Sequence, residues 1–223
     1  MTRTAFFRPF AISLTVACAG SLFSVSTASD WPHYGGDAGG SHYSELAQIH
    51  RGNVGLLELA WSYRTGDTGR YPELRAGAAL NVTPILLPAD AGGHLVLCAA
   101  MNRVIALDPA TGQERWVHDP QSPLAGTGSK YLCRGVAYWP DSQAQASAVC
   151  AHRVYTATRD LRLIALDARN GEPCTDFGVR GEVNLWPEIF SEVPDMNDGD
   201  VQFSAPPLVT GDLVIVGSAD NTK

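Results

Sequence analysis

Short apolar runs separated by turn residues recur along this chain of 223 residues. Residues 104–107 (VIAL) are apolar, residues 108–112 (DPATG) carry turn residues, and Trp116 lies in the run that follows. Asp can bond its own backbone, Pro fixes φ and Gly accepts positive φ, so this order predicts a strand, a tight turn and a second strand. We find no pattern typical of a long amphipathic helix. The pattern therefore predicts an all-β chain.

The same order of strand and turn residues returns later in the chain. Residues 163–172 (LIALDARNGE) repeat it, and Asp167 follows Asp108 by 59 positions. A fixed period of strands and turns is typical of a β-propeller with one blade per period, and the flanking strands repeat too, which disfavours two unrelated hairpins. We expect a partial propeller of about two and a half blades. The expected strands are residues 81–87, 94–99, 103–107 and 114–118 in the first blade, 133–139, 153–158 and 161–166 in the second, and 203–209 and 213–218 in the third.

The N-terminus has the features of a signal peptide. Basic residues precede an apolar stretch at residues 10–25, and small residues end at Ala28. We expect a signal peptide at 1–28, export to the periplasm, and one truncated propeller domain at 29–223. A retained N-terminal anchor is the alternative, so membrane association stays open. The short strand expected at 59–63 resembles one that closes a propeller ring.

Cysteine content and charge limit the chemistry. Four cysteines follow the signal peptide, and they allow three pairings. They are Cys98, Cys133, Cys150 and Cys174. An oxidising compartment permits disulfides, buried free thiols are the alternative, and the absence of a CxxC pair disfavours zinc or thioredoxin-like chemistry. The net charge of −7 gives no support for nucleic-acid binding.

Six segments, in their order and spacing, resemble the N-terminal part of membrane-type quinoprotein dehydrogenases, the glucose and quinate dehydrogenase group that uses pyrroloquinoline quinone (PQQ). They are residues 31–37, 53–63, 102–116, 133–139, 158–171 and 217–221. The resemblance implies an eight-bladed propeller with PQQ and a calcium ion near its axis. It also implies an oxidoreductase that oxidises an alcohol, sugar or polyol and passes electrons to ubiquinone or another respiratory acceptor.

The resemblance also suggests cofactor-binding residues. Arg134 is the strongest candidate, because a guanidinium can bind a carboxylate of PQQ through two parallel charge-assisted bonds. Thr158 and Ser204 match family positions where a hydroxyl bonds the quinone, and Ser218 is a further candidate. Asn81 stands where relatives often carry Glu or Gln. Ordinary surface or strand residues are the alternative at each position.

Asp220 and Asn221 are the metal-ligand candidates. They match a family position near the calcium, and calcium prefers carboxylate and carbonyl oxygens. An ordinary turn rich in Asp and Asn is the alternative. Met101 departs from the family, since some glucose-oxidising relatives carry a His there and a thioether binds a sugar hydroxyl poorly. Glucose itself is therefore not the expected substrate.

The catalytic Asp of the family lies on a later blade, so we assign no catalytic residue here. The chain reaches Lys223 part-way through the third blade. We expect this length alone to fold poorly and to be inactive, because open blades leave unpaired strand edges. The alternative function is a non-catalytic propeller scaffold of outer-membrane assembly, which shares the Asp-x-x-Thr-Gly-x-x-x-Trp repeat. Arg134, with Asp220 and Asn221, favours the dehydrogenase.

Overall fold

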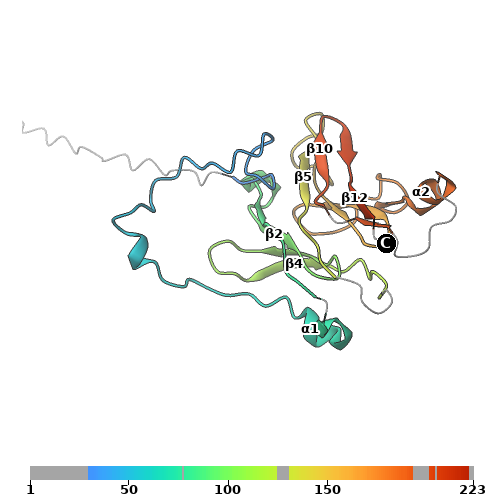
Figure 1. Ribbon diagram of the computed structural model, residues 1–223. Coiled ribbons are helices and arrows are strands. Elements are labelled where there is room, and N and C mark those ends of the chain that lie inside the picture. Colours follow the sequence, from blue (N-terminus) through green and yellow to red (C-terminus); the bar gives the residue numbers. More distant parts are fainter. Residues whose placement is uncertain (1–29, 77, 125–130, 193–200, 204, 221–223) are drawn as a thin grey trace, which may run out of the picture.

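The computed structural model describes residues 30–76, 78–124, 131–192, 201–203 and 205–220 (Figure 1). The predicted signal peptide, Ser204 and Asn221 lie outside these ranges. The regular secondary structure of the described chain is mostly β-strand with few short helices, which confirms the all-β partial propeller. None of the described helices has both the length and the apolar character that a bilayer crossing requires.

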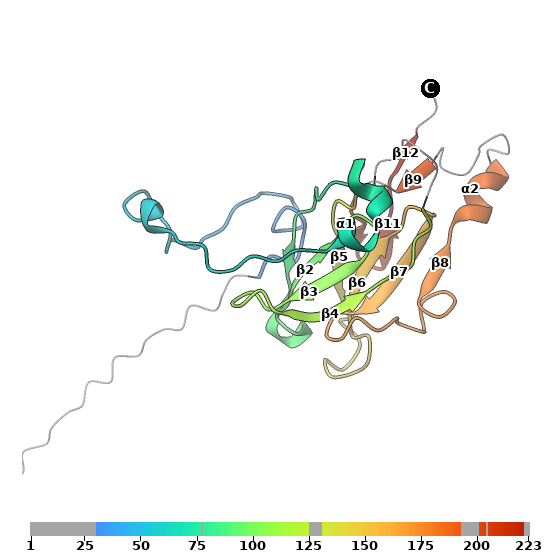
Figure 2. The same cartoon turned by 90° about the horizontal axis from the view of Figure 1, so that it is seen from below.

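Two four-stranded antiparallel sheets carry the fold, and Figure 2 shows them side by side. The first contains β1 (Ile85–Leu86), β2 (Leu95–Cys98), β3 (Val104–Leu107) and β4 (Glu114–His118). The second contains β5 (Ala137–Pro140), β6 (His152–Ala157), β7 (Arg162–Asp167) and β8 (Glu182–Asn184). In each sheet the strands follow one another in chain order, as expected for two propeller blades.

A third region continues the pattern with shorter strands. Here β10 (Leu208–Thr210) pairs with β11 (Leu213–Ile215), and β9 (Val201–Phe203) pairs with β12 (Ser218–Asp220). The described helices are short. They are α1 (Asp67–Arg70), α2 (Trp186–Glu192) and the 3-10 turns η1 (Val54–Leu56), η2 (Pro72–Ala76) and η3 (Ala89–Ala91).

The predicted strand at 59–63 is wrong. These residues have no ladder partner among the described strands, and a strand needs one. They instead belong to an extended arm that reaches away from the sheets (Figure 1). The Trp61 indole N–H donates to the Pro109 carbonyl at 3.1 Å, and the Tyr63 hydroxyl donates to Glu114 at 2.6 Å. The segment is thus held to the β3–β4 hairpin by side chains.

The repeated turn has a packing role. Gly112 and Gly171 have φ of +69° and +74°, and each lies under a tryptophan ring. A Cβ on Gly112 would be 2.5 Å from Trp61, and one on Gly171 would be 2.4 Å from Trp116. The Trp116 indole N–H also donates to the Ala168 carbonyl at 3.3 Å. Each tryptophan therefore joins its segment to the next turn, which explains why Gly and Trp recur together.

The core lies between the two large sheets. Buried residues of both sheets form one cluster: Val96, Val104, Ala106, Trp116, Val154, Ile164 and Leu166, among others.

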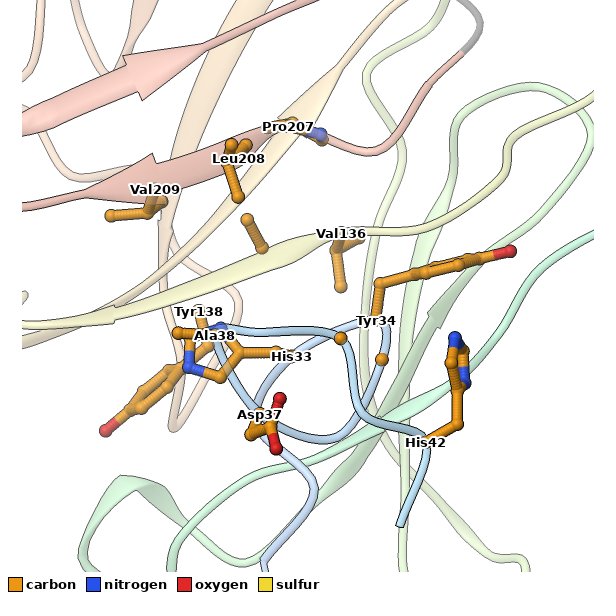
Figure 3. Close-up of a pocket in the computed structure, with 13 residues that line it drawn as sticks. His33, Tyr34, Asp37, Ala38, His42, Val136, Tyr138, Pro207, Leu208 and Val209 are labelled. Carbon is orange, nitrogen blue, oxygen red and sulfur yellow. The ribbon is translucent and has the colours of Figure 1, made fainter.

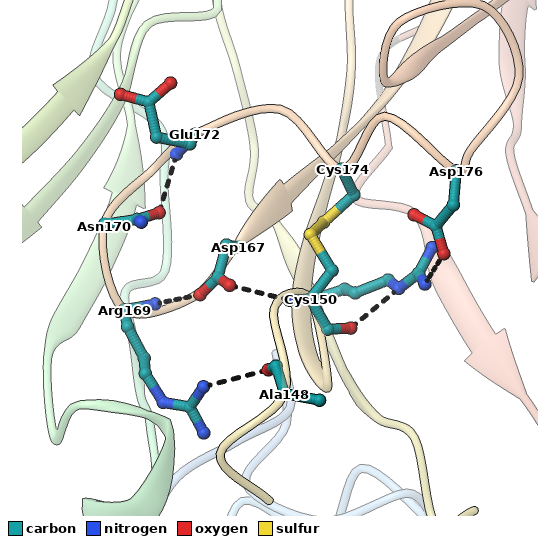
Figure 4. Close-up of a disulfide and its surroundings, with 9 residues drawn as sticks. Ala148, Cys150, Asp167, Arg169, Asn170, Glu172, Cys174 and Asp176 are labelled. Carbon is teal, nitrogen blue, oxygen red and sulfur yellow. Dashed lines mark hydrogen bonds and ion pairs between the residues drawn. A yellow bond between two sulfur atoms is a disulfide. The ribbon is translucent and has the colours of Figure 1, made fainter. Parts of the chain in front are cut away.

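The structure also settles the cysteine pairing left open by the sequence. Disulfides join Cys98 to Cys133, between the two sheets, and Cys150 to Cys174, within the second (Figure 4). The free-thiol alternative is therefore wrong.

Candidate functional site

The strand order brings the predicted cofactor residues to one end of the sheets. In the second sheet Ala137 pairs with Tyr155. Arg134 precedes Ala137 by three residues and Thr158 follows Tyr155 by three, so both lie beyond the same end of this antiparallel pair. The β-hairpin topology thus brings together two candidates that are 24 residues apart in sequence.

The neighbouring sheets place the other candidates at the corresponding end. In the first sheet Asn81 precedes β1, beside the turn that follows β2. In the third region β10 starts on the side where β11 ends, and Ser204 lies outside the described residues. The backbones of Ser218 and Asp220 lie just after that end, in β12. The first strands of all three units therefore start on one face of the molecule.

Arg134 has a restrained backbone and a free side chain. Its carbonyl accepts a hydrogen bond from the Thr83 N–H at 3.3 Å, and the preceding Cys133 is disulfide-bonded to Cys98. A Cβ added to Gly135 would lie 3.1 Å from Pro206, so the third region packs closely against this segment. The guanidinium is exposed and forms no ion pair or side-chain hydrogen bond within the described chain. It is available to an external anion.

Thr158 is arranged differently. It is fully buried, and its hydroxyl donates to the Arg162 carbonyl and accepts from the Arg162 N–H, both at 3.1 Å. These bonds stabilise the turn between β6 and β7. A purely structural role, the alternative considered from the sequence, accounts for both bonds. The cofactor role of Thr158 stays a prediction.

Asn102 is a residue of this face that the sequence reasoning did not select. It adopts a left-handed conformation with φ of 59° in the turn between β2 and β3. Its Nδ2 donates to the Ala157 carbonyl at 3.3 Å, and its Oδ1 accepts from the Arg159 N–H at 3.1 Å. Asn tolerates this conformation better than most residues, which was the available signal. Asn102 therefore links the β2–β3 turn to the β6–β7 turn.

Met101 is buried rather than open to a substrate. It is 2% exposed and packs with Leu74, Ala100 and Tyr131 under the segment that contains α1 and η2. An ion pair holds this segment in place: Asp67 Oδ1 lies 3.0 Å from Arg103 Nη1, and both side chains are at most 6% exposed. The other carboxylate oxygen, Asp67 Oδ2, accepts from the Ala100 N–H at 3.1 Å.

Two cavities adjoin this face. One of about 200 Å³ lies beside Gly135, and Tyr34, Val136 and Tyr138 contribute to its walls (Figure 3). The Tyr138 hydroxyl is 2.7 Å from His152 Nδ1, and burial raises the pKa of Tyr138 to about 12. This phenol therefore stays protonated at physiological pH.

The second cavity, of about 390 Å³, lies between residues 63–68 and residues 78–80. Residues 78–80 directly precede Asn81, so this cavity borders the start of the first sheet. The Ala79 N–H donates to the Tyr131 carbonyl at 3.1 Å and so ties residues 78–80 to Tyr131.

One of the predicted residues, Arg134, meets a chemical requirement of a PQQ site. PQQ carries three carboxylates, so its site needs cationic side chains that are not already paired. Arg134 meets this requirement, whereas the Thr158 hydroxyl is already engaged. Among the described residues the cluster with metal-ligand spacing is Cys150, Cys174 and Asp176, and its two sulfurs are joined in a disulfide. The calcium ligands Asp220 and Asn221 stay a prediction.

Residues 31–223 match the sequence profile of the family described as "PQQ: Glucose/ethanol/alcohol dehydrogenase, beta-propeller domain". The chain is 36% identical to quinoprotein glucose dehydrogenase A of Acinetobacter calcoaceticus, over 86% of this chain and 24% of that protein. It is 34% identical to a quinate/shikimate dehydrogenase (quinone) of Acinetobacter baylyi, over 86% of this chain and 24% of that protein.

Solved structures agree with these matches. The crystal structure of the quinohemoprotein alcohol dehydrogenase from Comamonas testosteroni superposes with a TM-score of 0.60 at 28% identity, over 86% of this chain and 23% of that one. The chain therefore spans about a quarter of the length of its curated relatives, which are 23–25% covered in the first five matches. The scaffold alternative finds no support in these matches.

Proposed function

The chain belongs to the β-propeller family of PQQ-dependent glucose, ethanol and alcohol dehydrogenases, and from this premise we propose that it forms one side of the PQQ site of an enzyme that oxidises a hydroxyl group of an alcohol, sugar or polyol. The unpaired guanidinium of Arg134, at the end of the second sheet where β5 starts, is the observation that carries this proposal. The relatives named for glucose, glycerol and quinate support this substrate class.

Arg134 binds and orients the cofactor. Its planar guanidinium would donate two parallel N–H bonds to one carboxylate of PQQ and would so position the cofactor. In this proposal the Asn81 amide and the hydroxyls of Ser204 and Ser218 would add neutral hydrogen bonds to PQQ. Thr158 would support the site indirectly, because its hydroxyl already bonds Arg162 and holds the β6–β7 turn. When bound, PQQ supplies the acceptor for the hydride that leaves the substrate carbon.

Asp220 and Asn221 hold calcium in this proposal. Carboxylate and amide oxygens are ligands that calcium prefers, and Asp220 is the last residue of β12. Calcium in such a site polarises a carbonyl as a Lewis acid. No residue of this chain is assigned the role of catalytic base.

The cellular setting is part of the same proposal. We place the protein in the periplasm after signal-peptide removal, with a respiratory quinone such as ubiquinone as electron acceptor. Two disulfides are consistent with an oxidising compartment, and one relative is named as a quinone-linked dehydrogenase. Fractionation of cells into membrane and soluble fractions tests whether the protein associates with the membrane.

Cofactor binding tests the proposal. The protein, expressed from its complete gene, is freed of cofactor and titrated with PQQ and calcium while the absorbance of bound PQQ is recorded. Two charge-assisted bonds of about 1.5–3 kcal/mol each predict that Arg134→Ala weakens PQQ binding at least about a hundredfold. Arg115→Ala is the control, because Arg115 is exposed near the opposite end of the first sheet and pairs with Asp108. Failure of the wild type to bind PQQ, or equal binding by Arg134→Ala, refutes the proposal.

A further inference from the structure

We propose that the Cys98–Cys133 disulfide positions Arg134 for PQQ, so that cofactor affinity depends on this crosslink and not on the Cys150–Cys174 disulfide. The inference rests on the proposed function, since it takes Arg134 as the residue that binds PQQ. It assigns a binding role to a crosslink that would otherwise be purely stabilising.

The backbone around Arg134 has little secondary structure to hold it. Residues 133–136 precede β5 and belong to no strand. The Arg134 carbonyl accepts one bond, from the Thr83 N–H, and at 3.3 Å this bond is longer than the usual backbone length. The packing of Gly135 against Pro206 adds van der Waals contact. The disulfide at the adjacent position is therefore the strongest restraint on this backbone.

The other end of the crosslink lies on a rigid element. Cys98 is fully buried at the end of β2 and pairs with Val104 of β3. The next residue, Ala99, donates its N–H to the Arg103 carbonyl at 2.8 Å, which closes the turn between these strands. The disulfide thus ties the segment of Arg134 to the first sheet, and the guanidinium extends from an anchored position. A restrained arginine loses less conformational freedom on binding a carboxylate.

The second disulfide provides a matched comparison within the same chain. It joins Cys150, just before β6, to Cys174, after β7, and both are buried (Figure 4). Because Arg134 lies beyond the start of β5 and Cys150 beyond the opposite end, the two are at different ends of the second sheet. The crosslinks close loops of 35 and 24 residues, so their effects on chain entropy are similar.

The test compares two double variants of the protein expressed from its complete gene. Both cysteines of one disulfide are replaced by alanine, as Cys98→Ala with Cys133→Ala or Cys150→Ala with Cys174→Ala. Alanine leaves no lone thiol that could add to the quinone. The dissociation constant for PQQ is measured by absorbance titration in the presence of calcium, and the melting temperature of the cofactor-free protein is measured alongside. Should the first variant fail to fold, Cys98→Val with Cys133→Ala restores apolar volume and replaces it.

The two variants should lose similar thermal stability but differ in binding. We expect PQQ affinity to fall about tenfold or more without the Cys98–Cys133 bond and to stay within about twofold without the Cys150–Cys174 bond. Arg134→Ala provides the specific readout. It should reduce PQQ affinity by a smaller factor when added to the variant without the Cys98–Cys133 bond than when added to the wild type. Equal affinities in the two variants, or an undiminished effect of Arg134→Ala, overturn the inference. If the wild type does not bind PQQ at all, the proposed function itself fails.

Discussion

Replacing Gly171 by alanine tests the packing that joins the two large sheets. Gly171 has a φ of +74°, and an added Cβ would lie 2.4 Å from Cε3 and 2.7 Å from Cδ2 of Trp116. Trp116 is 8% exposed and belongs to the core cluster shared by both sheets. The ring cannot stay in its present position, so the substitution should destabilise more than a backbone change alone.

The magnitude follows from three contributions. The left-handed conformation costs alanine about 1–2 kcal/mol. Displacing a packed core ring costs about 1–3 kcal/mol. Loss of the hydrogen bond from the Trp116 indole to the Ala168 carbonyl costs about 1 kcal/mol. Because partial relaxation of the ring reduces the sum, we expect Gly171→Ala to lower the free energy of unfolding by about 3–5 kcal/mol.

Gly211→Ala is the matched control. Gly211 also has positive φ, at +56°, but its added Cβ would meet no atom within 4 Å. It should therefore cost only the conformational part, about 1–2 kcal/mol. Urea denaturation of both variants, followed by circular dichroism and tryptophan fluorescence, measures the difference. If Gly171→Ala is no more destabilising than Gly211→Ala, the ring-on-glycine contact contributes nothing and the reasoning is refuted.

Three further predictions concern an ion pair, pH and covalent structure. Asp67→Asn leaves the buried Arg103 guanidinium without its nearest carboxylate and should lower the unfolding free energy by about 3 kcal/mol in urea denaturation; an unchanged midpoint would contradict it. Burial lowers the pKa of His118, so the unfolded chain binds more protons and stability should fall as the pH drops below about 6.5. His118→Gln should flatten this slope in melting curves between about pH 7 and pH 5. If the slope is unchanged in this variant, the pH dependence of stability comes from another group. Mass spectrometry of non-reduced peptides should recover Cys98 linked to Cys133 and Cys150 linked to Cys174, and any other pairing of these four cysteines would contradict the structure.

The turns were predictable because their chemistry is local. Asp108 Oδ1 accepts from the Ala110 and Thr111 N–H groups at 2.9 and 2.8 Å, as the Asp-x-x-Thr-Gly order suggests. The Arg115 guanidinium beside Asp108 lowers the pKa of that carboxyl to about 2. The strands on either side of this turn, and the repeat around Asp167, were also found where the apolar runs predicted them.

Predictions that required a distant partner were less successful. Residues 59–63 have the composition of a strand, but a strand forms only beside another, and Trp61 is instead held by its side chain. The Asn102 bridge between two turns joins segments more than 50 residues apart, which no local pattern reveals. Met101, considered at first for its nearness to a substrate, is covered by the segment that Asp67 anchors.

The amino-acid order alone determined the strand-and-turn period and the all-β architecture, because these depend on backbone preferences within a few residues. The resemblance to the family, together with the chemistry of a guanidinium, suggested Arg134. Only the tertiary structure decided which cysteines pair, which hydroxyls are already bonded, and that Arg134 combines an anchored backbone with an unpaired guanidinium. The physical reason is that pairing and burial depend on which segments meet in space, and the free energy of those contacts is shared by residues that are far apart in the chain.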